Sequence, residues 1–294
     1  MERRELPTPA RFAIGASWPV AAMLAAVSLG GLLVPAAYAR EAPAWVEQAI
    51  GQDWFDLVIA APWIAVCGYF ARRGSYRWSV LLAGAYAYVV YEMFIYAFAI
   101  HFNAFFLLYC ATLGLAGYAL VAEIMFLHRR IEPVDRRGAR IGGAFLVTLG
   151  SAFAAMWLAE DIPAMLRNEP SPTLAETGLF TNPVHVIDLA FVLPAHVVAG
   201  VLLWRGRPSG FLFGAIVLAF GVPMAASIGG MMLVIQLVGG AAAPAVTVAM
   251  LVVAAITAAV LARVLRGERA ATAAPSRSAP APTARRSAAG SAPA

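Results

Sequence analysis

Charged residues are what this sequence most clearly lacks. Only 13% of its 294 residues are charged, against about 25% in a soluble domain. The mean hydropathy is +0.77, and apolar runs of about 18 residues or more recur, each long enough to cross a bilayer as a helix. The short alternating strands of a β-barrel are also missing. The composition therefore excludes a soluble domain and predicts an all-α integral membrane protein that contacts the lipid bilayer.

Cysteine and the common catalytic motifs are scarce or missing as well. Cys67 and Cys110 fall at different depths of the predicted spans, whereas a disulfide needs Cα atoms within about 7 Å. We therefore expect two free, buried cysteines. The motifs HExxH, GxSxG, CxxC and CxxCH and a phosphate-binding glycine loop do not occur. No metal ligands are assigned, and no cofactor follows from these absences.

The apolar runs predict eight transmembrane helices, at about residues 14–38, 54–72, 78–100, 104–127, 141–159, 184–204, 211–237 and 245–265. They form one transmembrane domain over residues 1–266. The Ala/Pro/Ser/Arg-rich segment 267–294 predicts a disordered cytoplasmic tail. Ala37-Tyr38-Ala39 resembles a signal-peptidase site, but the uncharged run before it is far longer than a signal core of about 7–15 residues. We expect the first helix to be retained.

Arginine is distributed unequally between the two sets of loops, and the sequence contains no lysine. With the N-terminus assigned to the cytoplasm, 19 of the 21 arginines lie on that side and only Arg40 and Arg167 on the other. The positive-inside rule then predicts both termini in the cytoplasm of a bacterial inner-membrane protein. Because topology accounts for these charges, they do not indicate a nucleic-acid partner.

Two stretches of the chain are related by a constant offset of 132 residues. DLVIAAPWIAVCGYFARRG (56–74) and DLAFVLPAHVVAGVLLWRG (188–206) share seven of nineteen residues without a gap. The matches include Asp56 with Asp188 and Pro62 with Pro194. The pattern indicates a parallel 4+4 repeat with halves at about 12–127 and 141–266, a plan that some transporters use. We expect Pro62, Pro194 and Pro223 to kink their helices.

Polar residues in the sixth predicted span raise the question of function. His185, Asp188, Val192 and His196 are spaced by three, four and four residues, which predicts one shared helix face. Ionisable groups are costly inside a bilayer and usually face a partner or water. Asp56 is the repeat partner of Asp188. An alternative is that these residues only join helices, for example through a pair between His185 and Asp56.

Two glutamates lie in the predicted spans. Glu92 is near mid-bilayer, with Tyr88 and Tyr96 four residues before and after it. This spacing predicts one stripe in which the phenols hydrogen-bond the carboxyl. Glu123 lies near the inner end of the fourth span, where we expect it to anchor the helix through Arg129 or Arg130.

Further polar groups lie at the predicted outer membrane edge. Candidate binding or proton-site residues are Asp56, Glu92, His101, Asn103, Asn182, His185, Asp188 and His196. The segments YAFAIHFNAFFLLY (96–109) and NPVHVIDLAFVLP (182–194) hold several of them. At these segments the chain resembles a family of uncharacterised bacterial multi-pass membrane proteins. That resemblance implies a shared membrane core and assigns no catalytic or binding residue.

Three classes of function fit these features. A transporter or permease-like protein, with a polar site for a small solute or proton in the outer half of the membrane, fits the repeat and the intramembrane acids. A membrane-embedded heme, metal or quinone enzyme would use the histidines as ligands. A non-catalytic membrane scaffold would use the polar groups only to join helices. The sequence gives neither the substrate nor the oligomeric state.

Overall fold

The computed structural model describes residues 7–240 and 244–272, and this part of the chain is helical without strands. Eight helices in it are long and apolar enough to cross a membrane, as a multi-pass membrane protein requires. The eight span regions are Thr8–Leu33, Pro43–Ala71, Tyr76–Ala99, Phe106–His128, Arg136–Arg167, Pro183–Trp204, Pro208–Leu237 and Pro244–Arg266.

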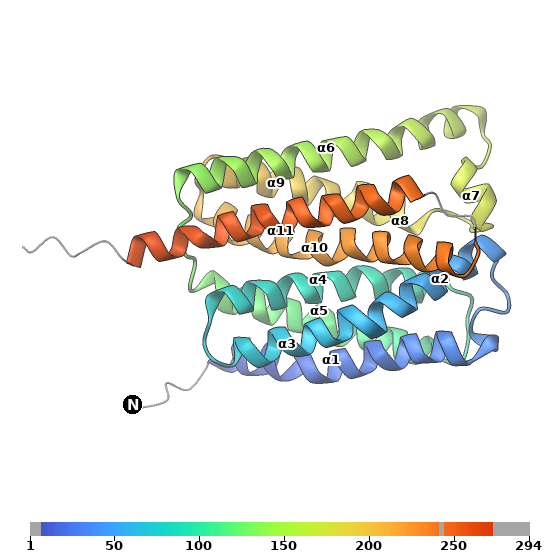
Figure 1. The fold of residues 1–294 in the computed structure, drawn as a ribbon, viewed down its shortest axis with the longest axis horizontal. Coiled ribbons are helices and arrows are strands. Elements are labelled where there is room, and N and C mark those ends of the chain that lie inside the picture. Colours follow the sequence, from blue (N-terminus) through green and yellow to red (C-terminus); the bar gives the residue numbers. More distant parts are fainter. Residues whose placement is uncertain (1–6, 241–243, 273–294) are drawn as a thin grey trace, which may run out of the picture.

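Six of these regions are single helices in Figure 1. They are α1 (Thr8–Leu33), α4 (Tyr76–Ala99), α5 (Phe106–His128), α6 (Arg136–Arg167), α10 (Pro208–Leu237) and α11 (Pro244–Thr272). The short helix α7 (Pro172–Thr177) lies at one end of the bundle. We call this end the α7 end. The N-terminus of α1 and the C-terminal part of α11 lie at the opposite end (Figure 1).

The other two span regions are interrupted by short π-helical segments. The first consists of α2 (Pro43–Phe55), η2 (Asp56–Ala60) and α3 (Ala61–Ala71), and the second of α8 (Pro183–Ile187), η3 (Asp188–Val192) and α9 (Leu193–Trp204). In each, the amide after the π segment bonds the aspartate carbonyl five residues earlier. Proline cannot donate to the preceding turn, and a π segment is one known way of accommodating this break. Pro62 and Pro194 thus follow wide turns, whereas Pro223 lies inside continuous α10.

Several predicted boundaries were wrong. The predicted loop 39–53 contains the 3-10 turn Pro35–Ala37 only at its edge, but most of it is helix α2. The fifth span extends at both ends, because Asp135 caps the α6 amides of Arg137 and Gly138 and the helix continues to Arg167. Residues 267–272, predicted as tail, continue α11. The rest of the predicted tail lies outside the described residues.

The helices pack as two groups of four that meet at α4 and α10. In one group α3 packs on α1 and α4, and α5 packs on α1 and α4. In the other α9 packs on α6 and α10, and α11 packs on α6 and α10. A Cβ at Gly84 of α4 would lie 2.5 Å from the backbone carbon of Ala219 in α10. The contact between the two groups therefore requires a glycine at this crossing.

The turns after α3 and α9 also match each other. Gly74 and Gly206 have φ values of +78° and +67°, a left-handed conformation that glycine adopts without a steric penalty. They are 132 residues apart, as are the starts of α4 and α10. The two glycines of the sequence repeat thus perform the same local task.

Candidate functional site

Three buried carboxyl groups meet between α2 and α4. Asp53 and Asp56 lie at the end of α2 and the start of η2, and Glu92 lies on α4. Their residues are 0%, 1% and 5% exposed. Glu92 lies within electrostatic range of both aspartates. We call this group the carboxyl cluster.

Neutral donors hold Asp56 in place. Tyr88 Oη donates to Asp56 Oδ1 at 2.5 Å, and Gln52 Nε2 donates to the same oxygen at 3.0 Å and to Tyr88 Oη at 2.6 Å. The other carboxylate oxygen, Oδ2, is buried and has no hydrogen-bond partner within the described part of the chain. Asp56 therefore keeps one oxygen available for a proton or a bound species.

Asp53 is bound by two phenols from different helices. Tyr38 Oη donates to Oδ2 at 2.6 Å, and Tyr96 Oη donates to Oδ1 at 2.8 Å. Tyr38 lies just after the turn that ends α1, so the carboxylate ties three segments together. A Cβ at Gly31 of α1 would collide with both Asp53 and Tyr38. The absence of a side chain there lets this site form.

The predicted tyrosine stripe on α4 exists, but its bonding was predicted wrongly. Tyr88 and Tyr96 do share a face with Glu92 and are buried. Their hydroxyls bond the aspartates of α2 and η2 rather than the Glu92 carboxyl. Phenols four residues away on the same helix extend outward from it, so they reach the neighbouring helix first.

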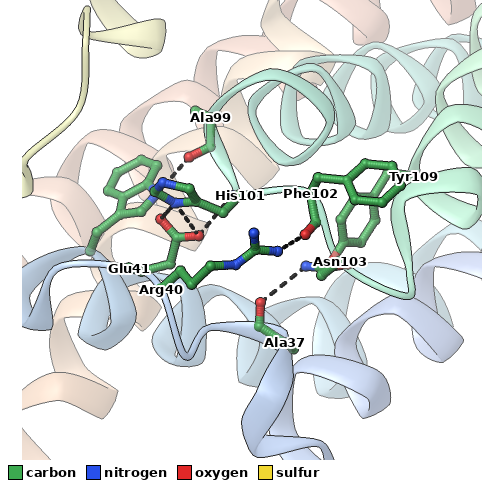
Figure 2. A network of polar contacts seen from close by, with 9 residues as sticks. Ala37, Arg40, Glu41, Ala99, His101, Phe102, Asn103 and Tyr109 are labelled. Atoms are coloured by element: carbon green, nitrogen blue, oxygen red, sulfur yellow. Dashed lines mark hydrogen bonds and ion pairs between the residues drawn. The ribbon is translucent and has the colours of Figure 1, made fainter.

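Further polar contacts link the carboxyl cluster with the loops at the α7 end. The Tyr109 ring lies edge-on to Tyr96, with centroids 5.5 Å apart. Asn103 Nδ2 donates to Tyr109 Oη at 3.2 Å and to Ala37 O at 3.0 Å (Figure 2). Asn103 is thus part of the outer wall of this site.

His101 lies in the same loop network but is further from the cluster. Its Nδ1 is 3.0 Å from both Glu41 carboxylate oxygens, and its ring is half exposed (Figure 2). Arg40 donates to Phe102 O beside it. These bonds join the loop before α2 to the loop before α5. His101 therefore closes the end of the bundle rather than entering the carboxyl cluster.

The histidine and aspartate of α8 and η3 form a second polar group. His185 Nδ1 is 2.9 Å from Asp161 Oδ1 of α6, and Trp157 Nε1 donates to Asp188 Oδ2 at 2.8 Å. The Trp157 and His185 rings are 4.2 Å apart. Asn182 caps α8 by accepting bonds from Val184 N and His185 N. His185 thus pairs with Asp161, and the example of a pair with Asp56 was wrong.

The two polar groups approach each other on α4. Tyr91 lies against Asp188, while Tyr88, three residues earlier, bonds Asp56. The aspartates that start the two π segments therefore each meet a phenol of the same helix. Sequence position alone put Asp56 and Asp188 in related places, and α4 is what connects them.

His196 has a different environment from the other members of its predicted face. It is 5% exposed, its Nδ1 is 2.7 Å from Val192 O, and its ring lies edge-on to Phe220 of α10. The π segment between Asp188 and Val192 changes the helical phase, so the regular spacing of three, four and four does not keep one direction. The single shared face was therefore a wrong prediction.

Glu123 was also interpreted wrongly. Its side chain is fully buried, and neither carboxyl oxygen makes a hydrogen bond within the described residues. Arg130, one of its expected partners, instead lies over the Phe126 ring. The cysteines are both free, as predicted, but Cys110 is exposed and only Cys67 is buried.

Asp53 is the main site residue missing from the predicted candidates. It was noted only as one of several polar groups at the outer edge, because the sequence predicted a loop at 39–53. The signal was its offset of 132 from His185, which places Asp53 and Asp56 opposite His185 and Asp188 in the repeat. The partners Tyr38 and Gln52 gave no comparable signal.

Known metal chemistry and known relatives add no further assignment. The described residues contain no group of three or more His, Cys, Asp or Glu side chains arranged to hold a metal ion. Comparison with models of protein families, with curated proteins and with solved structures gave no match to this chain.

Proposed function

We propose that this protein is a transporter-like membrane protein in which Asp53, Asp56 and Glu92 form a proton site. One observation carries the proposal: three buried carboxyls lie together, and the bonds to the two aspartates come from tyrosines and a glutamine. Three negative charges in a region poor in water are costly without cations. A cluster of this kind takes up protons, and their exchange can be coupled to movement of a solute.

The distribution of arginine supports the orientation of the site. Arg11, Arg77, Arg140, Arg207 and Arg263 belong to the bundle end opposite α7, and most other arginines lie in the loops there. Applying the positive-inside rule, we assign that end to the bacterial cytoplasm, with both termini inside. The carboxyl cluster then lies in the outer half of the membrane, below the Asn103 and His101 loop.

The repeat supports a transporter-like plan. The two π segments start at Asp56 and Asp188, two residues 132 apart, and each is followed by a proline and a terminal Arg-Gly turn. We assign α1–α5 and α6–α11 as parallel halves about an axis along the membrane normal. In this plan the α4–α10 contact is the interface across which the halves would move.

Infrared spectroscopy of the full chain in lipid nanodiscs tests the proton site. Protonated carboxyls give a C=O stretching band that carboxylates lack. A step in pH should change this band if the cluster exchanges protons with water. Asp56→Asn and Glu92→Gln should each remove part of the change. Asp135→Asn is the matched control, because Asp135 is an acid outside the cluster that pairs with Arg263.

The outcomes separate the proposed function from a scaffold. If the carboxyl band of the wild type does not respond to pH, or if both cluster variants respond like the wild type, the proton site is refuted. Polar groups that only join helices would give such a result. A response lost in the cluster variants and retained in Asp135→Asn would support the site.

A further inference from the structure

A cavity of about 420 Å³ lies beside the α4–α10 contact. Its walls come from α4, α5, η3, α9 and α10, and they are apolar, with Val90, Phe94, Leu120, Phe191, Val217 and Phe220 among them. The volume is within the range of about 300–1,000 Å³ that small-molecule sites occupy.

The cavity runs from the surface of the bundle to its interior. Phe191 at one wall is 68% exposed, whereas Phe220 is 6% exposed and Tyr91 is 7% exposed. All of these residues lie within regions long and apolar enough to cross the membrane. The exposed side of the cavity therefore faces lipid, and a ligand would enter from the bilayer.

His196 provides the cavity with a polar group of defined character. Its Nδ1 lies 2.7 Å from the Val192 carbonyl oxygen, which can only accept, so Nδ1 carries the hydrogen. In a neutral imidazole the other nitrogen, Nε2, is then a hydrogen-bond acceptor. Within the described part of the chain Nε2 has no hydrogen-bond partner. The cavity thus presents an acceptor to its ligand.

The second polar group at the cavity has another partner. Tyr91 lines it, but its hydroxyl lies against Asp188, which Trp157 also binds. A bound molecule would therefore meet apolar walls and one histidine acceptor. A ketone or an ester, which only accepts hydrogen bonds, would leave that nitrogen unpaired.

We propose that this cavity binds a lipid-soluble alcohol, a molecule with a long apolar chain and a hydroxyl that donates to His196 Nε2. This site is separate from the carboxyl cluster and goes beyond the proposed proton site. Its test measures binding without any pH change, so it can fail while the proton site holds, and the reverse is also true.

The test uses farnesol, a fifteen-carbon prenyl alcohol, and its methyl ether, which has the same chain and no hydroxyl hydrogen. Binding of each to the full chain is measured by native mass spectrometry and by thermal shift in detergent. The wild type should bind farnesol saturably, with one molecule per chain. It should prefer the alcohol about tenfold over the ether, which corresponds to about 1.4 kcal/mol.

Two variants separate the roles of the polar group and the cavity. His196→Phe should bind alcohol and ether equally, because the acceptor is lost. Ala195→Trp should weaken both, because Ala195 is exposed at the cavity wall and a large ring there would fill it. Non-saturable binding to the wild type would overturn the proposal. So would an unchanged preference in His196→Phe. The alcohol–ether comparison needs no variant, so a misfolded variant does not prevent the test.

Discussion

Replacing Tyr88 with phenylalanine should destabilise the protein through one identifiable set of bonds. The change keeps the ring, which packs edge-on to Phe55 with centroids 6.4 Å apart. It removes the 2.5 Å bond to Asp56 and the 2.6 Å bond from Gln52. Hydrogen bonds to charged groups contribute about 1.5–3 kcal/mol in soluble proteins, and those within membranes average about 0.6 kcal/mol. We therefore expect a loss of about 1–3 kcal/mol in the free energy of unfolding.

The pairwise part of this loss can be measured with a double-mutant cycle. Tyr88→Phe, Asp56→Asn and the double variant are unfolded in mixed detergent while tryptophan fluorescence is followed. In the Asp56→Asn background the tyrosine change should cost less, because an amide oxygen is a weaker acceptor than a carboxylate. We expect a coupling energy of about 1 kcal/mol, above the additivity error of about 0.3–0.5 kcal/mol.

Tyr86 provides the matched control on the same helix. It is also fully buried, but its hydroxyl donates to the Ala13 carbonyl at 2.5 Å. Tyr86→Phe should therefore destabilise the protein by about 0.5–1.5 kcal/mol and show no coupling to Asp56. Additive effects for Tyr88 and Asp56, or equal coupling for both tyrosines, would refute the bonding described for the carboxyl cluster.

Two further predictions concern stability away from the cluster. Arg263 donates two hydrogen bonds to Asp135, and these bonds, together with backbone amides, lower the pKa of Asp135 to about 2. Stability from a lowered carboxyl pKa is present above its unfolded value, about 3.9, and is lost as the pH falls through about 2. Asp135→Asn should thus lower the melting temperature near pH 7 and have little effect near pH 2; a constant deficit would argue against the ion pair. Gly84→Ala should destabilise the α4–α10 contact by about 1–3 kcal/mol through overpacking. Gly114→Ala, where a Cβ would have no neighbour within 4 Å, should be neutral or stabilising, and equal melting temperatures for the two variants would contradict that contact.

Sequence patterns were sufficient for the membrane-spanning helices and insufficient for their ends. Hydropathy identifies a span because about 20 apolar residues are needed to cross lipid. It does not locate the end of a helix that continues beyond the apolar run. Helix α2 begins at Pro43, well before the predicted start at 54, because residues 43–53 contain Glu47 and Asp53 and are not apolar enough to be detected. The site residue Asp53 was misplaced in a loop for this reason.

Side-chain partners were predicted less well than positions. His185 and Glu92 were correctly identified as buried polar residues. Their neighbours depend on how separate helices rotate against one another, and spacing within one helix carries no information on that rotation. The π segments add a local shift of phase that an ideal period of 3.6 residues cannot represent. This shift separates His196 from the direction of His185 and gives it the cavity as its environment.

Helix α4 connects the carboxyl cluster, the second polar group and the cavity. Tyr88 and Glu92 belong to the first, and Tyr91 contacts Asp188 and also lines the cavity. Because Tyr91 and Glu92 are adjacent on one rigid helix, a rotation or shift of α4 would move both together. A ligand that fills the cavity and a proton that enters the carboxyl cluster therefore act on the same element. Coupling between two sites requires an element whose arrangement both of them bias, and α4 meets that requirement through direct contacts. If both sites exist, farnesol should change the pH response of the carboxyl band in the wild type and leave it unchanged in Ala195→Trp.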